Sequence, residues 1–154
     1  MVSITGSSAT GSTAMLERSR TVGWGRFALV GLGTVVAAVL ANVLVYSLGR
    51  AIVGYDPQFL PLADVGTAIF FTAIPALVAT ILYAALLRCA RRPARTFAII
   101  AAVVFVVTTI PDFTYIPGVT GATVGQTAVL VIMHIVAAAA IVGLLTRFAR
   151  PQGR

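Results

Sequence analysis

The chain has 154 residues, of which 59% are hydrophobic and 10% charged, and its mean hydropathy is +1.02. Charged residues make up about a quarter of an ordinary soluble domain, so this composition excludes that class. The net charge is +7, all eleven basic residues are arginine, and the single cysteine, Cys89, excludes an intrachain disulfide. The apolar stretches leave no room for a folded aqueous domain, so we expect any ligand or partner to be met in or at the lipid bilayer.

Four apolar stretches are each long enough to cross a bilayer as a helix, which takes roughly 20 residues for a hydrocarbon core about 30 Å thick. We predict spans over about 27–48, 66–87, 96–113 and 126–146. The third stretch is the shortest, because Pro111 follows its apolar run after Ile110. We therefore expect this span to extend toward Phe113, to sit nearly upright or to thin the bilayer. All eleven arginines avoid the spans. The sequence therefore predicts an all-α polytopic membrane protein, a four-transmembrane-helix bundle.

The segments around the spans are short and polar or rich in turn-forming residues. The first span is too long for the apolar region of a signal peptide, so we interpret it as a retained helix. Asp64 is placed to cap the N-terminus of the second span. The predicted organisation is a disordered tail over 1–25, a transmembrane domain over 26–147 and a basic tail over 148–154, with loops over 49–65, 88–95 and 111–125.

The distribution of arginine predicts the orientation. Ten of the eleven arginines lie before the first span, between the second and third spans, or after the fourth, and only Arg50 lies on the other side. The positive-inside rule then places both termini and the middle loop in the cytosol. The absence of lysine beside abundant alanine and valine suggests a GC-rich bacterial genome. We therefore expect a multi-pass protein of the bacterial cytoplasmic (inner) membrane, N-in and C-in.

Small and polar residues recur at helical spacing in every span, as expected where helices pack against each other in lipid. We predict that these stripes face the bundle interior, and close helix packing is their simplest interpretation. The stripes are Gly31, Thr34, Ala38 and Asn42 with Tyr46; Thr72, Ala76, Thr80 and Tyr83; Ala98, Ala101, Phe105, Thr108 and Asp112; and Gln126, Leu130, His134, Ala138 and Ile141.

A group of polar residues is predicted to lie at similar depth in the outer half of the bundle. The ligand-binding candidates are Asn42, Tyr46, Thr108, Asp112 and His134. We expect Asn42 and His134, the only histidine, to form a hydrogen-bonded pair, with Thr108 next and Asp112 as a cap. One interpretation is an outer-facing cavity that binds a ligand or relays a proton. The other is a hydrogen bond that only fixes helix packing.

The remaining chemistry is sparse. Arg88, Arg91, Arg92 and Arg95 are candidates for contact with anionic lipid headgroups, besides being a topology signal. Nucleic-acid binding is not expected, because a short basic loop offers no groove-reading element. One histidine and one distant cysteine do not make a metal site, and no cofactor is predicted. No complete catalytic motif occurs, so we do not expect an enzyme.

Three hypotheses of function remain. The first is a non-enzymatic protein that acts by association in the membrane, as a homo-oligomer or as an accessory subunit of another membrane protein. The second is a transporter, channel or small-ligand binder that uses the outer-facing polar cavity around His134. The third and weakest is haem or quinone binding by a dimer that shares His134.

Three local features together resemble a known family. They are Asn42 with Tyr46 near the end of the first span, the basic segment Arg88 to Arg95, and the pair Met133-His134 in the last span. The pattern, over about Arg26 to Arg147, resembles an uncharacterised family of small actinobacterial membrane proteins, domain-of-unknown-function family 6069. The resemblance implies four membrane helices and an inner-membrane location, and it supplies no catalytic residues.

Overall fold

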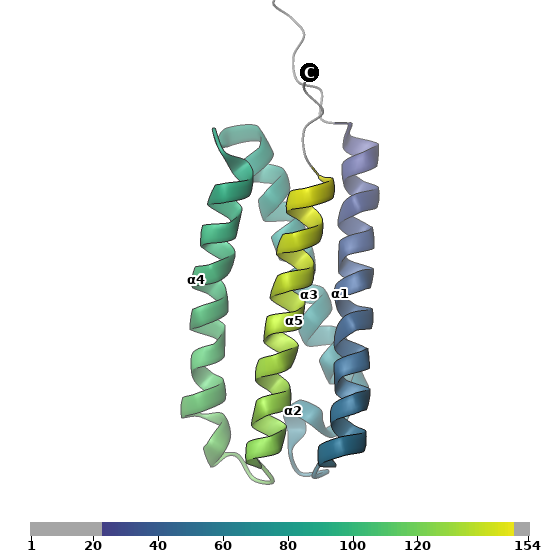
Figure 1. Ribbon diagram of the computed structural model, residues 1–154, viewed down its shortest axis with the longest axis vertical. Helices are drawn as coiled ribbons and strands as arrows, with labels where there is room; N and C mark the ends of the chain where they lie inside the picture. Colours follow the sequence, from purple (N-terminus) through teal and green to yellow (C-terminus); the bar gives the residue numbers. More distant parts are fainter. Residues whose placement is uncertain (1–22, 150–154) are drawn as a thin grey trace, which may run out of the picture.

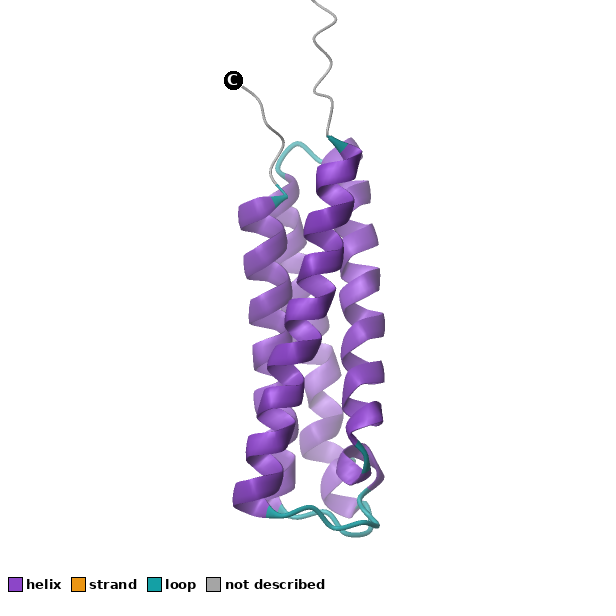
Figure 2. Ribbon diagram, turned by 90° about the vertical axis from the view of Figure 1, so that its right-hand side faces the viewer, coloured by secondary structure: helices purple, strands orange, loops and turns teal. Residues whose placement is uncertain are grey.

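A computed structural model describes residues 23–149, and within that range all regular structure is helical (Figures 1 and 2). The elements are α1 (Trp24–Val53), α2 (Leu60–Ala63), α3 (Val65–Cys89), α4 (Pro93–Thr114), the 3₁₀ turn η1 (Ile116–Gly118) and α5 (Val124–Phe148). The helices α1, α3, α4 (with η1) and α5 are long and apolar enough to cross a membrane. The predicted all-α transmembrane bundle is therefore confirmed.

The four long helices form a ring in which α1 and α4 each pack between α3 and α5. The beginning of α1, the α3–α4 connection and the end of α5 lie together at one end of the bundle (Figure 1). We call this the basic end, because Arg26, Arg88, Arg91, Arg92, Arg95 and Arg147 belong to it. The other end, here called the opposite end, holds α2, η1 and the connection to α5.

All four long helices extend beyond the limits set by hydropathy, and α1 extends furthest. α1 begins at Trp24, within the predicted tail, and continues to Val53 before Gly54 ends it with a φ of 70°. The rest of the predicted tail, and residues 150–154, lie outside the described residues. Such ends are missed because a hydropathy criterion stops at the first charged residue, whereas arginine is a good helix former. The predicted loop over 49–65 is accordingly shorter and contains α2.

The predicted basic loop over 88–95 is also wrong in its extent. Arg88 belongs to the last turn of α3, and Arg95 to the first turn of α4. α4 begins at Pro93, where the fixed φ of proline suits the first helical turn and no backbone donor is lost. Its far end reaches Thr114, so the predicted extension toward Phe113 is confirmed.

Side chains cap two of the helices. The Asp64 carboxylate accepts a 2.7 Å hydrogen bond from the Gly66 N–H, as predicted. Thr123 and Gln126 form a capping box at the start of α5, in which each side chain accepts a hydrogen bond from the other's backbone N–H. These bonds satisfy donors that would otherwise be unpaired at the helix ends.

The bundle interior consists of two apolar clusters. The predicted stripes of the first and second spans are buried in α1 and α3, and their small residues let the helices approach closely. A Cβ added to Gly31 would lie 2.5 Å from Thr80 Cγ2. The cluster toward the basic end contains Phe27, Ala38, Ala76, Tyr83, Phe97, Ile141, Leu145 and Ala149, and the other contains Tyr46, Phe59, Leu62, Ala68, Ile116, Val129 and Met133.

Candidate functional site

Polar residues occupy the stretch between the two apolar clusters on all four long helices. Asn42 follows Ala38 and precedes Tyr46 on the buried stripe of α1, and Thr72 lies between Ala68 and Ala76 on α3. On α5, His134 lies between Met133 and Ile141 of the two clusters. We call Asn42, Thr72, Asp112 and His134 the polar layer. By the helical rise, Asn42 and His134 lie about 16 Å and about 15 Å from the helix ends at the opposite end of the bundle.

Asn42 and Thr72 connect α1 to α3. The Asn42 Nδ2 donates a 2.8 Å hydrogen bond to Thr72 Oγ1, and the Thr72 hydroxyl in turn donates to the Ala68 carbonyl at 2.7 Å. Both side chains are buried. The other end of the amide, Asn42 Oδ1, is buried and has no hydrogen-bond partner among residues 23–149. Because an amide oxygen only accepts hydrogen bonds, the group that would complete this site is a donor.

Asp112 and His134 connect α4 to α5. The His134 Nδ1 lies 3.2 Å from Asp112 Oδ2 and 3.0 Å from the Leu130 carbonyl oxygen one turn earlier in its own helix. One ring N–H does not point at both acceptors, and Asp112 Oδ2 receives no well-directed hydrogen bond within the described part of the chain. The two groups are thus close enough to form an ion pair when His134 is protonated, while Asp112 Oδ2 keeps an unused acceptor position.

The exposure of the two partners differs. The Asp112 side chain is 7% exposed and the His134 side chain 35% exposed. The Asp112 carboxylate is therefore enclosed by the bundle, whereas one side of the His134 imidazole lies at the bundle surface. Both contacts of this ring are made by Nδ1 and neither by Nε2. A buried acceptor left unpaired costs about 1–3 kcal/mol. The polar layer contains two of them, Asn42 Oδ1 and Asp112 Oδ2.

The predicted pair of Asn42 with His134 is wrong. Asn42 bonds to Thr72, and His134 contacts Asp112. Thr72 was on the predicted stripe of the second span, and this position was the signal that could have identified it as the partner of Asn42.

Thr108 does not belong to the polar layer. Its side chain is exposed, and its hydroxyl donates to the Val104 carbonyl at 2.8 Å. Thr109, one residue later, is buried instead and bonds to the Phe105 carbonyl at 2.7 Å. Because adjacent helical residues are about 100° apart around the axis, a one-residue error in the assumed face exchanges the two threonines.

Tyr46 serves a different local structure at the opposite end. Its hydroxyl donates to the Leu62 carbonyl at 3.2 Å and accepts a 3.4 Å hydrogen bond from Arg50 Nη1. The Tyr55 hydroxyl donates to the Tyr46 carbonyl at 2.8 Å. Burial raises the pKa of Tyr55, which keeps its phenol protonated as this donor. These bonds tie α1 to α2 and to the loop between them.

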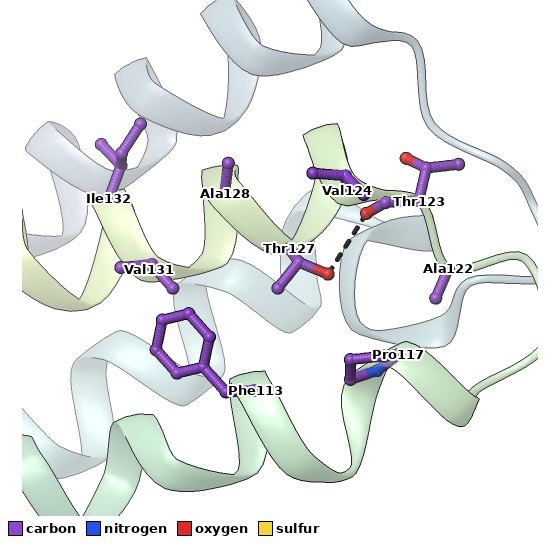
Figure 3. A pocket seen from close by; sticks show the side chains of 9 residues that line it. All are labelled: Phe113, Pro117, Ala122, Thr123, Val124, Thr127, Ala128, Val131 and Ile132. Atoms are coloured by element: carbon purple, nitrogen blue, oxygen red, sulfur yellow. Dashed lines mark hydrogen bonds between the residues drawn. The ribbon is translucent and has the colours of Figure 1, made fainter.

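A groove of about 540 Å³ lies at the opposite end, between α5 and the end of α4 with η1 (Figure 3). Phe113 points from α4 toward Val131 of α5, and most other lining side chains are apolar. Thr127, which also lines it, donates its hydroxyl hydrogen bond to the Thr123 carbonyl. The groove therefore offers surface for apolar groups and few polar contacts, so the polar layer is the better candidate site.

Metal binding finds no support in the described part of the chain, where no three His, Cys, Asp or Glu side chains gather. Cys89 is exposed at the end of α3, far in sequence from the only histidine.

The lipid-contact candidates Arg88, Arg91, Arg92 and Arg95 are all exposed at the basic end.

Comparison with known proteins gives one match. The model of a family of unknown function, DUF6069, matches residues 22–151. No curated protein and no solved structure shows significant similarity to the chain. Evidence for a specific activity therefore has to come from the geometry of the polar layer.

Proposed function

Since the chain belongs to DUF6069, a family of unknown function, we propose from its geometry that it is a non-enzymatic membrane protein that binds a small positively charged ligand in the polar layer. The proposed ligand is a small cation or a proton carried by water. The observation that carries the proposal is the enclosed Asp112 carboxylate, 3.2 Å from His134 Nδ1 and with an acceptor position unused.

The chemistry of the unused atoms supports this class of ligand. Asn42 Oδ1 and Asp112 Oδ2 are both acceptors, so an anion or an apolar molecule would leave them unpaired. Ionisable side chains inside membrane spans are costly and typically mark ion or proton pathways. His134, whose side chain is 35% exposed, is in contact with the enclosed carboxylate and can exchange a proton with it.

The proposed location is the bacterial cytoplasmic membrane, with both termini in the cytosol. The gathering of Arg26, Arg88, Arg95 and Arg147 at one end of the bundle supports this orientation through the positive-inside rule. The opposite end, which holds Arg50 as its only described arginine, would then face outward.

The test is ion flux into vesicles that contain the purified protein and a pH-sensitive dye. A potassium gradient with valinomycin drives protons inward, and a sodium-sensitive dye repeats the measurement for sodium. We expect the wild type to exceed protein-free vesicles for at least one ion, and Asp112→Asn to abolish the excess. Thr108→Val, about one helical turn before Asp112 on the exposed face of the same helix, is the matched control and should retain it. Wild-type flux equal to that of protein-free vesicles for both protons and sodium would contradict passage of these ions through the polar layer.

Association with a second copy is the second candidate function, and the packing of α4 favours it. Among its 22 residues only Phe97, Thr109 and Asp112 are buried, and Val103, Val106 and Val107 are among the exposed ones. Crosslinking and native mass spectrometry in mild detergent test it. A strictly monomeric protein without a co-purifying partner would contradict this candidate.

A further inference from the structure

The basic end contains a continuous row of aromatic rings that crosses three helices. Trp24 meets Phe27 edge-on at 6.0 Å between ring centroids, Phe27 stacks with Tyr83 at 6.5 Å, and Tyr83 contacts Phe97 at 5.0 Å. Phe27, Tyr83 and Phe97 are buried, whereas Trp24 is 44% exposed. The buried rings hold Trp24 in place from one side and leave the rest of its indole at the surface.

Arg88 lies on the exposed part of this row. Its guanidinium carbon is 4.3 Å from the centroid of the Trp24 ring, a cation–π contact between α3 and α1. Such stacking uses the face of the guanidinium and leaves its N–H donors, which lie in the guanidinium plane, free to bind an oxyanion. The contact also restricts a long side chain that would otherwise lose conformational freedom when it binds a ligand.

No described acidic residue neutralises this end of the bundle. Asp56 and Asp64 lie at the opposite end, and Asp112 is enclosed in the polar layer. Arg88 makes no salt bridge within residues 23–149, where the contact of His134 with Asp112 is the one ion pair. The charge of Arg88 is therefore available to an external anion.

We infer that Trp24 and Arg88 form a binding site for the headgroup of an anionic phospholipid. Tryptophan is the residue typical of the membrane–water interface, and arginine binds phosphate with paired, charge-assisted hydrogen bonds. Ala85 and Ile81, three and seven residues before Arg88 on α3, are exposed on the same side of that helix. They provide an apolar surface below the phosphate, along which an acyl chain packs.

This site differs from the general attraction of a basic surface for anionic lipid. General attraction is shared by all arginines near the surface, so Arg147→Gln would weaken it as much as Arg88→Gln. Arg147 is exposed at the same end, and the one cation–π contact among the described residues is that of Arg88 with Trp24. Lipid binding at a site made by Trp24 and Arg88 should therefore depend on Arg88 and not on Arg147.

Trp24 is the only tryptophan of the chain, so its fluorescence reports directly on the site. The full-length protein is reconstituted in phosphatidylcholine vesicles that contain a small, equal fraction of either brominated phosphatidylglycerol or brominated phosphatidylcholine. Because bromine quenches tryptophan on contact, quenching measures which lipid lies beside Trp24. Beyond the general attraction of the other arginines at this end, we expect Arg88 to contribute about fivefold enrichment of the anionic lipid at Trp24, the equivalent of about 1 kcal/mol.

Arg88→Gln should reduce this enrichment to near one, and Arg147→Gln should leave it unchanged. Circular dichroism of both variants verifies that the helices are intact. Equal quenching of the wild type by the two lipids, or equal loss in the two variants, would overturn the proposed site. Inorganic phosphate added to vesicles of phosphatidylcholine alone should leave Trp24 emission unchanged, and a saturable change would assign the site to free phosphate instead of lipid.

Discussion

Removing His134 while Asp112 stays in place is the perturbation with the most specific consequence for stability. In His134→Leu the Asp112 carboxylate, 7% exposed, loses the only basic side chain within ion-pair distance of it among the described residues. Breaking a buried ion pair on one side costs about 3–5 kcal/mol, because the remaining charge is left uncompensated. Loss of an ordinary hydrogen bond between membrane helices costs only about 0.6 kcal/mol on average.

The reverse substitution should be milder. In Asp112→Leu the remaining His134 side chain is 35% exposed and keeps its contact with the Leu130 carbonyl, so we expect a loss of about 1 kcal/mol. The double variant should then be more stable than His134→Leu alone, because no charge remains enclosed. This inversion, in which a second substitution restores stability, distinguishes an ion pair from two independent contacts.

The assay is unfolding in mixed micelles at increasing fractions of a denaturing detergent, followed by circular dichroism at neutral pH. The three variants and the wild type form a double-mutant cycle that isolates the energy of the pair. Thr108→Val controls for a substitution on α4 outside the polar layer and should change stability by less than about 0.5 kcal/mol. Effects of the two single substitutions that add within about 0.5 kcal/mol would refute the reasoning, because contacting residues are coupled.

Three further predictions concern stability and use the same unfolding assay. Gly49→Ala should cost about 1–3 kcal/mol, because the new Cβ would meet the Tyr55 hydroxyl and lie 2.9 Å from both methyl groups of Val129 on α5. Gly33→Ala, with nothing within 4 Å, should not destabilise, and equal effects would contradict close packing around Gly49. Thr72→Val should cost about 0.6–1.7 kcal/mol by leaving the Asn42 amide without its acceptor, and a neutral effect would show that this bond contributes nothing. Tyr55→Phe should cost about 1 kcal/mol at neutral pH by removing the hydrogen bond to the Tyr46 carbonyl. Burial raises the pKa of Tyr55 above its ordinary 10.0, so this stabilisation is present below pH 10.0 and should disappear as the pH rises above it; a difference between wild type and variant that persists there would contradict the assignment.

The number of spans and the buried faces of α1 and α3 could be predicted from the sequence. Both depend on local periodicity, and a stripe such as Thr72, Ala76, Thr80 on one helix face identifies itself without knowledge of its neighbours. The helix ends were less predictable, because hydropathy does not register the helical turns that carry Arg50 and Arg95.

The partners within the polar layer could not be predicted in the same way. Which side chains meet depends on the order of the helices around the ring and on the rotation of each about its axis, and neither is encoded in the spacing within one span. The choice between Thr108 and Thr109 shows the limit, since a rotation of about 100° decides it. The contact of Trp24 with Arg88 was missed for a related reason, because Trp24 was assigned to the tail although it begins α1.

The most direct test of a binding site in the polar layer is an experimental structure of the protein in native lipid, at a resolution that shows ordered water and ions. The proposal predicts non-protein density within hydrogen-bond distance of Asp112 Oδ2 or Asn42 Oδ1, the two buried acceptors without a partner. A dry interior, in which both oxygens accept hydrogen bonds directly from other side chains, would contradict it and leave the polar layer as a structural element of helix packing.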